Sequence, residues 1–266
     1  MIIDWKASKQ SWIDDLRARL IPRLRADVRF SDVDRLVRRF NDTVSRWQAH
    51  DDFRPVINDG NELCAAAALL GDLRPGDRLR YEPRLQATAK SIDFCVEWHD
   101  GGRSWIDMKT VAPRWQDDDA AWQRFCTIAA DFPDNAMLLV DRDFCGAALS
   151  GQALKARWSF VQRALELEAK IAFLTEAEHG PVRLLLCNDG AWHEDDLEDF
   201  ADYYFSGRFR ADDWAQNAVA RYTADRNQTF ARSIAGFCYV ERRQDEVFAR
   251  RFKVDVRGPR LFGWAA

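Results

Sequence analysis

Apolar residues recur every three to four positions in three stretches at the start of the chain. The first two cover residues 12–24 and 33–47. The third, at residues 62–70, is rich in alanine, a strong helix former, and follows a polar start near Asp59. We therefore expect three helices in this part of the chain.

The spacing of apolar residues then changes to a period of two. Residues 79–81 are a candidate strand, and residues 91–98 and 104–111 each alternate apolar and polar side chains. A turn sequence with two glycines, residues 99–103, separates the last two strands. This pattern predicts a meander of three strands.

The remainder of the chain alternates between helical and strand patterns. Helical spacing returns at 118–132, 152–178, 195–205 and 212–230, and strand patterns occur at 136–140, 182–187, 236–241 and 248–256. We expect an α/β fold with a mixed central β-sheet flanked by helices and helical additions at both ends. Residues 1–50 are then an N-terminal helical segment packed on a core of residues 51–266, in one continuous domain, because no Pro-, Gly- or Ser-rich linker divides them.

The charge of the chain is slightly acidic but unevenly distributed. The 266 residues carry 39 basic and 43 acidic side chains, a net charge of −4 that lacks the basic signature of a nucleic-acid coat protein. The net charge is +4 over residues 1–50, −7 over residues 51–150 and −1 over residues 151–266. This distribution suits phosphate contacts by the chain ends around a cation-binding centre, although charged outer faces of helices explain it equally well.

The composition also indicates the cellular compartment in which the protein is expected. With 47% hydrophobic residues the chain is expected to fold, and no stretch approaches the roughly 18 apolar residues of a membrane span. The six cysteines form no Cys-x-x-Cys pair, which favours thiols in a reducing compartment over a zinc site or disulfides. We expect a cytoplasmic protein with no membrane partner.

Burial favours one register for the hairpin between the second and third strands. Pairing Phe94 with Met108 and Val96 with Ile106 puts the apolar residues of both strands on one core face. A slip of one residue would set apolar side chains against the polar face of the partner strand. We therefore expect a turn centred on Gly101.

In this register Asp93 lies opposite Lys109, and Asp107 shares with both the face away from the core. Two carboxylates this close can bind one cation, and hard oxygen ligands suit Mg²⁺ or Mn²⁺. Lys109 beside the cation can hold or deprotonate a water, or offset charge that develops on a phosphate. The plainer alternative is an exposed ion pair on a hairpin, which contributes at most about 1 kcal/mol.

The spacing of these residues resembles that of the PD-(D/E)xK nuclease superfamily, which has the restriction-endonuclease-like fold. The resemblance spans about residues 55–141, where a helix, a strand, a hairpin, a helix and a strand follow one another. It implies that Asp93, Asp107 and the backbone carbonyl of Met108 bind a divalent metal, and that Lys109 supports a water nucleophile. An isoleucine replaces the proline of the family name, and the second acid is Asp instead of Glu; neither change removes a needed chemical group.

Three further side chains are candidates for the same site. Many members of the superfamily add a Glu from the helix before the strands, and Glu62 matches that position, with a solvated helical Glu as the alternative. Glu82, beside the first strand, is a rival for the extra metal ligand. Gln123, on the helix expected after Lys109, can reach a phosphate or a water, although an ordinary surface Gln is favoured.

The resemblance implies a Mg²⁺- or Mn²⁺-dependent enzyme that hydrolyses phosphodiester bonds of DNA, an endonuclease rather than an exonuclease. Two alternatives stay open: a catalytically inactive nucleic-acid-binding or structural protein on the same fold, and a nuclease directed at RNA. The presence of Asp93, Asp107 and Lys109 argues against loss of activity. The sequence leaves the oligomeric state open, and a homodimer is compatible with it.

Overall fold

A computed structural model describes residues 5–50, 53–88, 90–111, 149–188, 194–207, 230–241 and 249–255. The helix expected at 118–132, the strand expected at 136–140 and nearly all of the helix expected at 212–230 lie outside these ranges, as does Gln123. Within the ranges, no helix combines the length and the apolar character that a membrane crossing needs.

The described residues form a six-stranded mixed sheet in the order β1-β2-β3-β4-β5-β6. The strands are β1 Arg78–Tyr81, β2 Phe94–Glu97, β3 Arg103–Val111, β4 Val182–Asn188, β5 Gly236–Glu241 and β6 Ala249–Asp255. The first three strands are antiparallel neighbours, β3, β4 and β5 run parallel, and β6 is antiparallel to β5. The expected meander and the mixed sheet are both confirmed.

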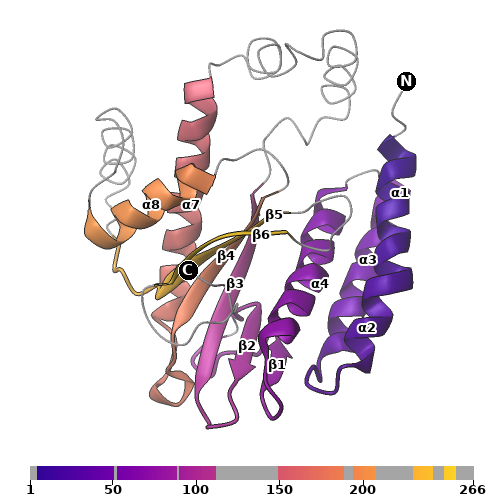
Figure 1. The fold of residues 1–266 in the computed structure, drawn as a ribbon, viewed down its shortest axis with the longest axis horizontal. Helices are drawn as coiled ribbons and strands as arrows, with labels where there is room; N and C mark the ends of the chain where they lie inside the picture. The colour runs from indigo at the N-terminus through magenta and orange to yellow at the C-terminus, as the bar shows by residue number, and fades with distance from the viewer. Residues whose placement is uncertain are drawn as a thin grey trace.

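Helices cover both faces of the sheet, as Figure 1 shows. On one face lie α1 Trp5–Asp15, the π-helical turn Leu16–Leu20, α2 Ile21–Ala26, α3 Val33–His50 and α4 Arg54–Asp72. On the other lie α7 Leu149–Ile171 and α8 Glu194–Ser206, and a 3-10 turn, Glu176–Glu178, precedes β4. The protein therefore has a mixed α/β architecture.

Each face of the sheet has its own hydrophobic core. Phe94, Ile106 and Met108 belong to the core that contains α1–α4. Cys95 and Trp105 point the opposite way and belong to the core that contains α7 and α8. Because the N-terminal helices share a core with α4 and the sheet, the first part of the chain packs directly on the rest of the fold.

Helix α4 begins earlier than its alanine-rich segment indicates. The expected start near Asp59 is wrong, since the helix begins at Arg54 with Pro55 in its first turn, where a backbone N–H has no helical partner in any case. Gly60 therefore lies inside the helix, against Trp12 of α1. A Cβ atom at Gly60 would lie 2.3 Å from the indole ring, so the close approach of α1 to α4 depends on this glycine.

The register expected for the β2–β3 hairpin is wrong by two residues. Phe94 pairs with Ile106, two residues short of its expected partner. A shift of two leaves every side chain on the same face, so the hydrophobic pattern cannot distinguish the two registers. The turn decides between them, because the N–H of Trp98 donates a 2.9 Å hydrogen bond to the carbonyl of Gly102 and closes a loop that is not centred on Gly101.

The face of the hairpin that carries Asp107 was expected to lie away from the core, and this expectation is also wrong. Helices α7 and α8 cover that face, and the Asp107 side chain has an exposed fraction of 0%. A carboxylate in such surroundings needs charged or hydrogen-bonding partners. The candidate site is therefore an interior site, and helices outside the hairpin help to form it.

Candidate active site

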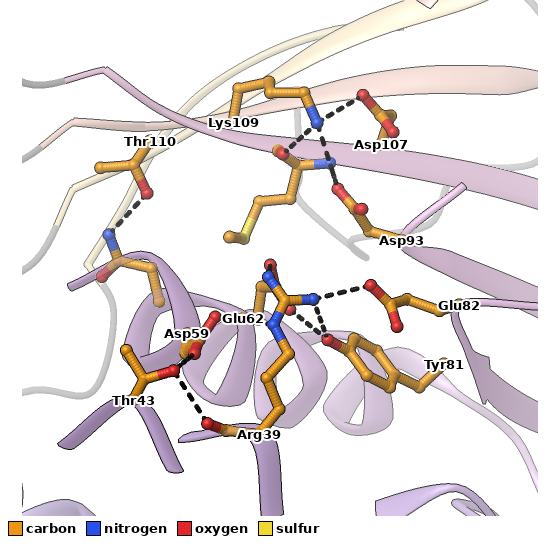
Figure 2. Close-up of polar contacts among 12 residues, drawn as sticks. Arg39, Thr43, Asp59, Glu62, Tyr81, Glu82, Asp93, Asp107, Lys109 and Thr110 are labelled. Atoms are coloured by element: carbon orange, nitrogen blue, oxygen red, sulfur yellow. Dashed lines mark hydrogen bonds and ion pairs between the residues drawn. The ribbon is translucent and has the colours of Figure 1, made fainter. Parts of the chain in front are cut away.

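The structure brings Asp93, Asp107 and Lys109 together around one ammonium group, as Figure 2 shows. Nζ of Lys109 lies 2.8 Å from Oδ2 of Asp107 and 3.5 Å from Oδ2 of Asp93. It also donates a 2.9 Å hydrogen bond to the backbone carbonyl of Met108. The ammonium thus occupies a place lined by three oxygen atoms, from two carboxylates and one carbonyl.

Asp93 enters this site from the residue before β2. Its backbone carbonyl accepts a 2.7 Å hydrogen bond from the N–H of Glu82, and its Oδ2 accepts one of 2.7 Å from the N–H of Met108. The Asp93 carboxylate therefore serves as an acceptor for a backbone N–H of β3. This contact holds it beside the strand that carries Asp107 and Lys109.

The two oxygens of Asp107 have different surroundings. Oδ1 accepts a 2.6 Å hydrogen bond from Nζ of Lys170, in the last turn of α7. Oδ2 forms the ion pair with Lys109 but receives no well-aligned hydrogen bond. Asp107 is therefore held on one side, while its second oxygen faces Lys109 and retains acceptor capacity.

Burial and neighbouring charges shift the protonation of this site. Burial raises the pKa of Asp93, and the charge of Asp107 raises it further. Burial alone would lower the pKa of Lys109, but the charges of Asp93 and Asp107 outweigh burial, and the pKa is raised. Lys109 is therefore a positively charged group held between carboxylates.

Arg39 of α3 organises a second polar cluster, below the first in Figure 2. Its Nη1 lies 2.6 Å from Oε1 of Glu82 and 2.7 Å from the hydroxyl of Tyr81. Its Nε lies 2.9 Å from Oδ1 of Asp59, and its Nη2 lies 3.3 Å from Oε1 of Glu62. The Tyr81 hydroxyl donates a 2.6 Å hydrogen bond to Oε2 of Glu62. Arg39 thus connects α3 to α4 and to the end of β1.

The structure places Glu62 and Glu82 in this Arg39 cluster rather than beside Asp107. Burial raises the pKa of Glu62 to about 8, and the charge of Asp93 contributes to the shift, so the two clusters are electrostatically coupled. Glu82 has a positive φ of 43°, and its carboxylate pairs with Arg39. Both carboxylates pair with Arg39, and a role for either as an extra metal ligand stays a prediction.

The place around Nζ of Lys109 has the chemistry of a cation site. Among the residues that the structure describes, no group of three or more His, Cys, Asp or Glu side chains could hold a metal ion. This place differs from such a group because its third oxygen is the carbonyl of Met108. Its three oxygens already surround a positive charge, and Oδ2 of Asp107 can accept a further contact. Mg²⁺ prefers oxygen ligands of this kind. The residues present therefore fit a hard divalent cation.

Arg39 and Lys170 are functional candidates that sequence reasoning missed. Arg39 is one of many arginines in the N-terminal helices, and a lysine in the last turn of a helix is ordinarily explained by the helix dipole. Their partners Glu62 and Asp107 lie 23 and 63 positions away in the chain. No local pattern signals either contact.

A scan against protein-family models and searches of curated proteins and of solved structures find no match to the chain. The chemistry of the site therefore carries the functional argument.

Proposed function

We propose that this protein is a Mg²⁺-dependent endonuclease that hydrolyses phosphodiester bonds of DNA through a site of the PD-(D/E)xK type, with Mn²⁺ as a substitute ion. One observation carries the proposal: two carboxylates and a backbone carbonyl converge on the ammonium of Lys109. Asp93 and Asp107 supply these carboxylates, and a strand residue between Asp107 and Lys109 supplies the carbonyl.

The arrangement of the elements supports a restriction-endonuclease-like core. Helix α4, strand β1 and the β2–β3 hairpin follow one another in the chain, in the order that the resemblance implies. The helix expected at 118–132 and the strand expected at 136–140, which would complete that order, lie outside the described residues. The acids lie on the hairpin, and β4 extends the sheet parallel to β3.

Each residue has a role that its position supports. Asp93, Asp107 and the carbonyl of Met108 would hold the cation. A bound Mg²⁺ supplies positive charge against the phosphate and makes water easier to deprotonate. The ammonium of Lys109 contacts these oxygens when no cation is bound, and beside a bound cation it would orient the attacking water or offset negative charge that develops on the phosphate. Burial of Asp107 strengthens these electrostatic effects, because water screens charges less in the interior.

The N-terminal helices support a nucleic-acid substrate. Arg35 and Arg38 are exposed on α3, the helix that also carries Arg39. The guanidinium of Arg35 lies over the ring of Tyr81, 5.1 Å from its centroid, so this basic surface adjoins the Arg39 cluster. Arginine matches the geometry of phosphate, and contacts to phosphate supply much of the affinity for nucleic acid.

The buried cysteines support a cytoplasmic location for this activity. Cys64, Cys95, Cys187 and Cys238 all lie in the interior. Buried thiols without a Cys-x-x-Cys pattern are typical of proteins that work in a reducing compartment.

The proposal is tested by incubating supercoiled plasmid with the protein and Mg²⁺ or Mn²⁺. We expect nicking or linearisation by the wild type, and a loss of more than about 100-fold for Asp107→Ala and Lys109→Ala, which exceeds the loss typical of outer-shell changes. Asp100→Asn in the hairpin turn is the matched control, because an Asn oxygen can still accept the hydrogen bond from Gly102. A circular substrate has no ends, so its cleavage identifies an endonuclease.

The other outcomes separate the alternatives. Equal cleavage by the wild type, Asp107→Ala and Lys109→Ala would refute the mechanism. Cleavage of a structured RNA but not of plasmid or linear DNA would identify an RNA nuclease. Binding of DNA without cleavage in either metal would favour an inactive binding protein on the same fold.

A further inference from the structure

Lys170 belongs to the candidate site although it lies on a different element from the hairpin. Its Nζ lies 2.6 Å from Oδ1 of Asp107, and its side chain has an exposed fraction of 21%. Helix α7, which packs against β3 and β4, carries Lys170 in its last turn. The negative end of the helix dipole favours a positive charge there. Lys170 is therefore held near Asp107 by the packing of α7 as well as by the ion pair.

We propose that Lys170 is a positioning residue that fixes the Asp107 carboxylate with Oδ2 directed toward the proposed cation-binding site. This inference rests on the metal-dependent function proposed above. The hydrogen bond from Lys170 occupies Oδ1, and it leaves Oδ2 as the oxygen that faces Lys109. Because Asp107 has no exposed surface, bulk water cannot readily replace the bond from Lys170.

The contacts of the two lysines show why their roles differ. Lys109 contacts all three oxygens that would bind a cation, so it occupies the same place as the cation. Lys170 instead contacts the opposite oxygen of Asp107, Oδ1. The bond from Lys170 is thus compatible with cation binding, whereas the full set of Lys109 contacts is not. Lys170 can keep the carboxylate oriented in both states.

Mn²⁺ binding to the full-length protein without nucleic acid, measured by isothermal titration calorimetry, tests this role. We expect Lys170→Met to bind Mn²⁺ about 10- to 100-fold more weakly, the usual effect of losing an outer-shell partner of a metal ligand. Lys170→Arg retains charge and donors and should recover most of the affinity. Lys90→Met is the matched control, because Lys90 is exposed and lies over the ring of Phe173.

Each result has a defined consequence. Equal or tighter binding by Lys170→Met would overturn the positioning role, since it would show that the ammonium acts only as a repelling charge or not at all. Failure of the wild type to bind Mn²⁺, or equal binding by Asp93→Asn, would instead refute the metal centre itself and this role with it. If Lys170→Met shows no cooperative melting transition, Lys170→Gln provides the same comparison with a neutral donor.

Discussion

The carboxylate of Asp93 accepts a 2.7 Å hydrogen bond from the backbone N–H of Met108, on the neighbouring strand. The Asp93 side chain is thereby bonded to β3 at Met108, between Asp107 and Lys109, whose side chains lie on the same face of the strand. This bond makes the position of Asp93 depend on the strand that carries Asp107 and Lys109. Asp93 therefore has two roles, as a hydrogen-bond acceptor for Met108 and as a negative charge in the site.

Two substitutions of Asp93 distinguish these roles. Asp93→Asn keeps an acceptor for Met108 and removes a charge that lies close to Asp107, so we expect stability equal to or above that of the wild type and at least about 100-fold slower plasmid cleavage. Asp93→Ala also leaves the N–H of Met108 without its acceptor and should cost about 1–3 kcal/mol of stability. Urea denaturation and cleavage rates measure both effects. If Asp93→Asn cleaved plasmid at the wild-type rate, the proposed role of the Asp93 carboxylate in cleavage would be wrong.

Glu62 makes the stability of the protein depend on pH. Burial raises its pKa in the folded protein from 4.5 to about 8, so the folded state binds the Glu62 proton more tightly than the unfolded state. The stability from this group is complete below about pH 4.5 and is lost as the pH rises toward 8. Glu62→Gln removes this dependence. We therefore expect the stability of Glu62→Gln relative to the wild type to increase between pH 5 and pH 8, in thermal melts with a chelator present.

The matched control for this titration is Glu166→Gln on α7. The Glu166 side chain is 40% exposed and pairs with Arg163 in the same helix, so its replacement should not change the pH trend. Parallel pH curves for the wild type and Glu62→Gln would show that Glu62 does not titrate in this range.

Arg39 stabilises the junction between α3, α4 and β1. Arg39→Met would leave the buried carboxylate of Asp59 without its cation, and removing one partner of a buried ion pair typically costs about 3–5 kcal/mol. Because the Arg39 side chain is 40% exposed and water can enter in its place, we expect about 2–3 kcal/mol by urea denaturation. Arg38→Met, one position earlier and exposed, should stay within about 0.5 kcal/mol of the wild type. An equal loss of stability in Arg39→Met and Arg38→Met would show that the contacts of Arg39 do not stabilise this junction.

Gly60 offers a test of the contact between α1 and α4. Inside a helix, Gly→Ala ordinarily stabilises by about 1 kcal/mol, but a Cβ here would lie 2.3 Å from Cη2 of Trp12. Overpacking of this kind typically costs about 1–3 kcal/mol, so we expect Gly60→Ala to destabilise the protein. Trp12→Phe removes the clashing ring atoms, and the added cost of Gly60→Ala should be smaller in that background. A stabilising Gly60→Ala would show that α1 does not lie this close to α4.

Local patterns were enough to predict most of the described elements and the face shared by Asp107 and Lys109. Residues two apart on a strand project to the same side whatever the rest of the fold does, and helical spacing is equally local. The sequence by itself therefore determined the mixed α/β architecture, the meander and the spacing of the candidate acid and lysine. It also led to Asp93, the residue before β2, because a register shift of two leaves each side chain on the same face.

Only the tertiary structure decided the hairpin register, the burial of the site and the partners of its charges. The register depends on the turn, which closes at Trp98 and Gly102 for reasons of backbone geometry that hydrophobic alternation does not report. Glu62, expected as an extra metal ligand, pairs with Arg39, and Asp107 pairs with Lys170, because α3 and α7 pack on opposite faces of the sheet. Such contacts join residues far apart in the chain, so they follow from packing rather than from any local pattern.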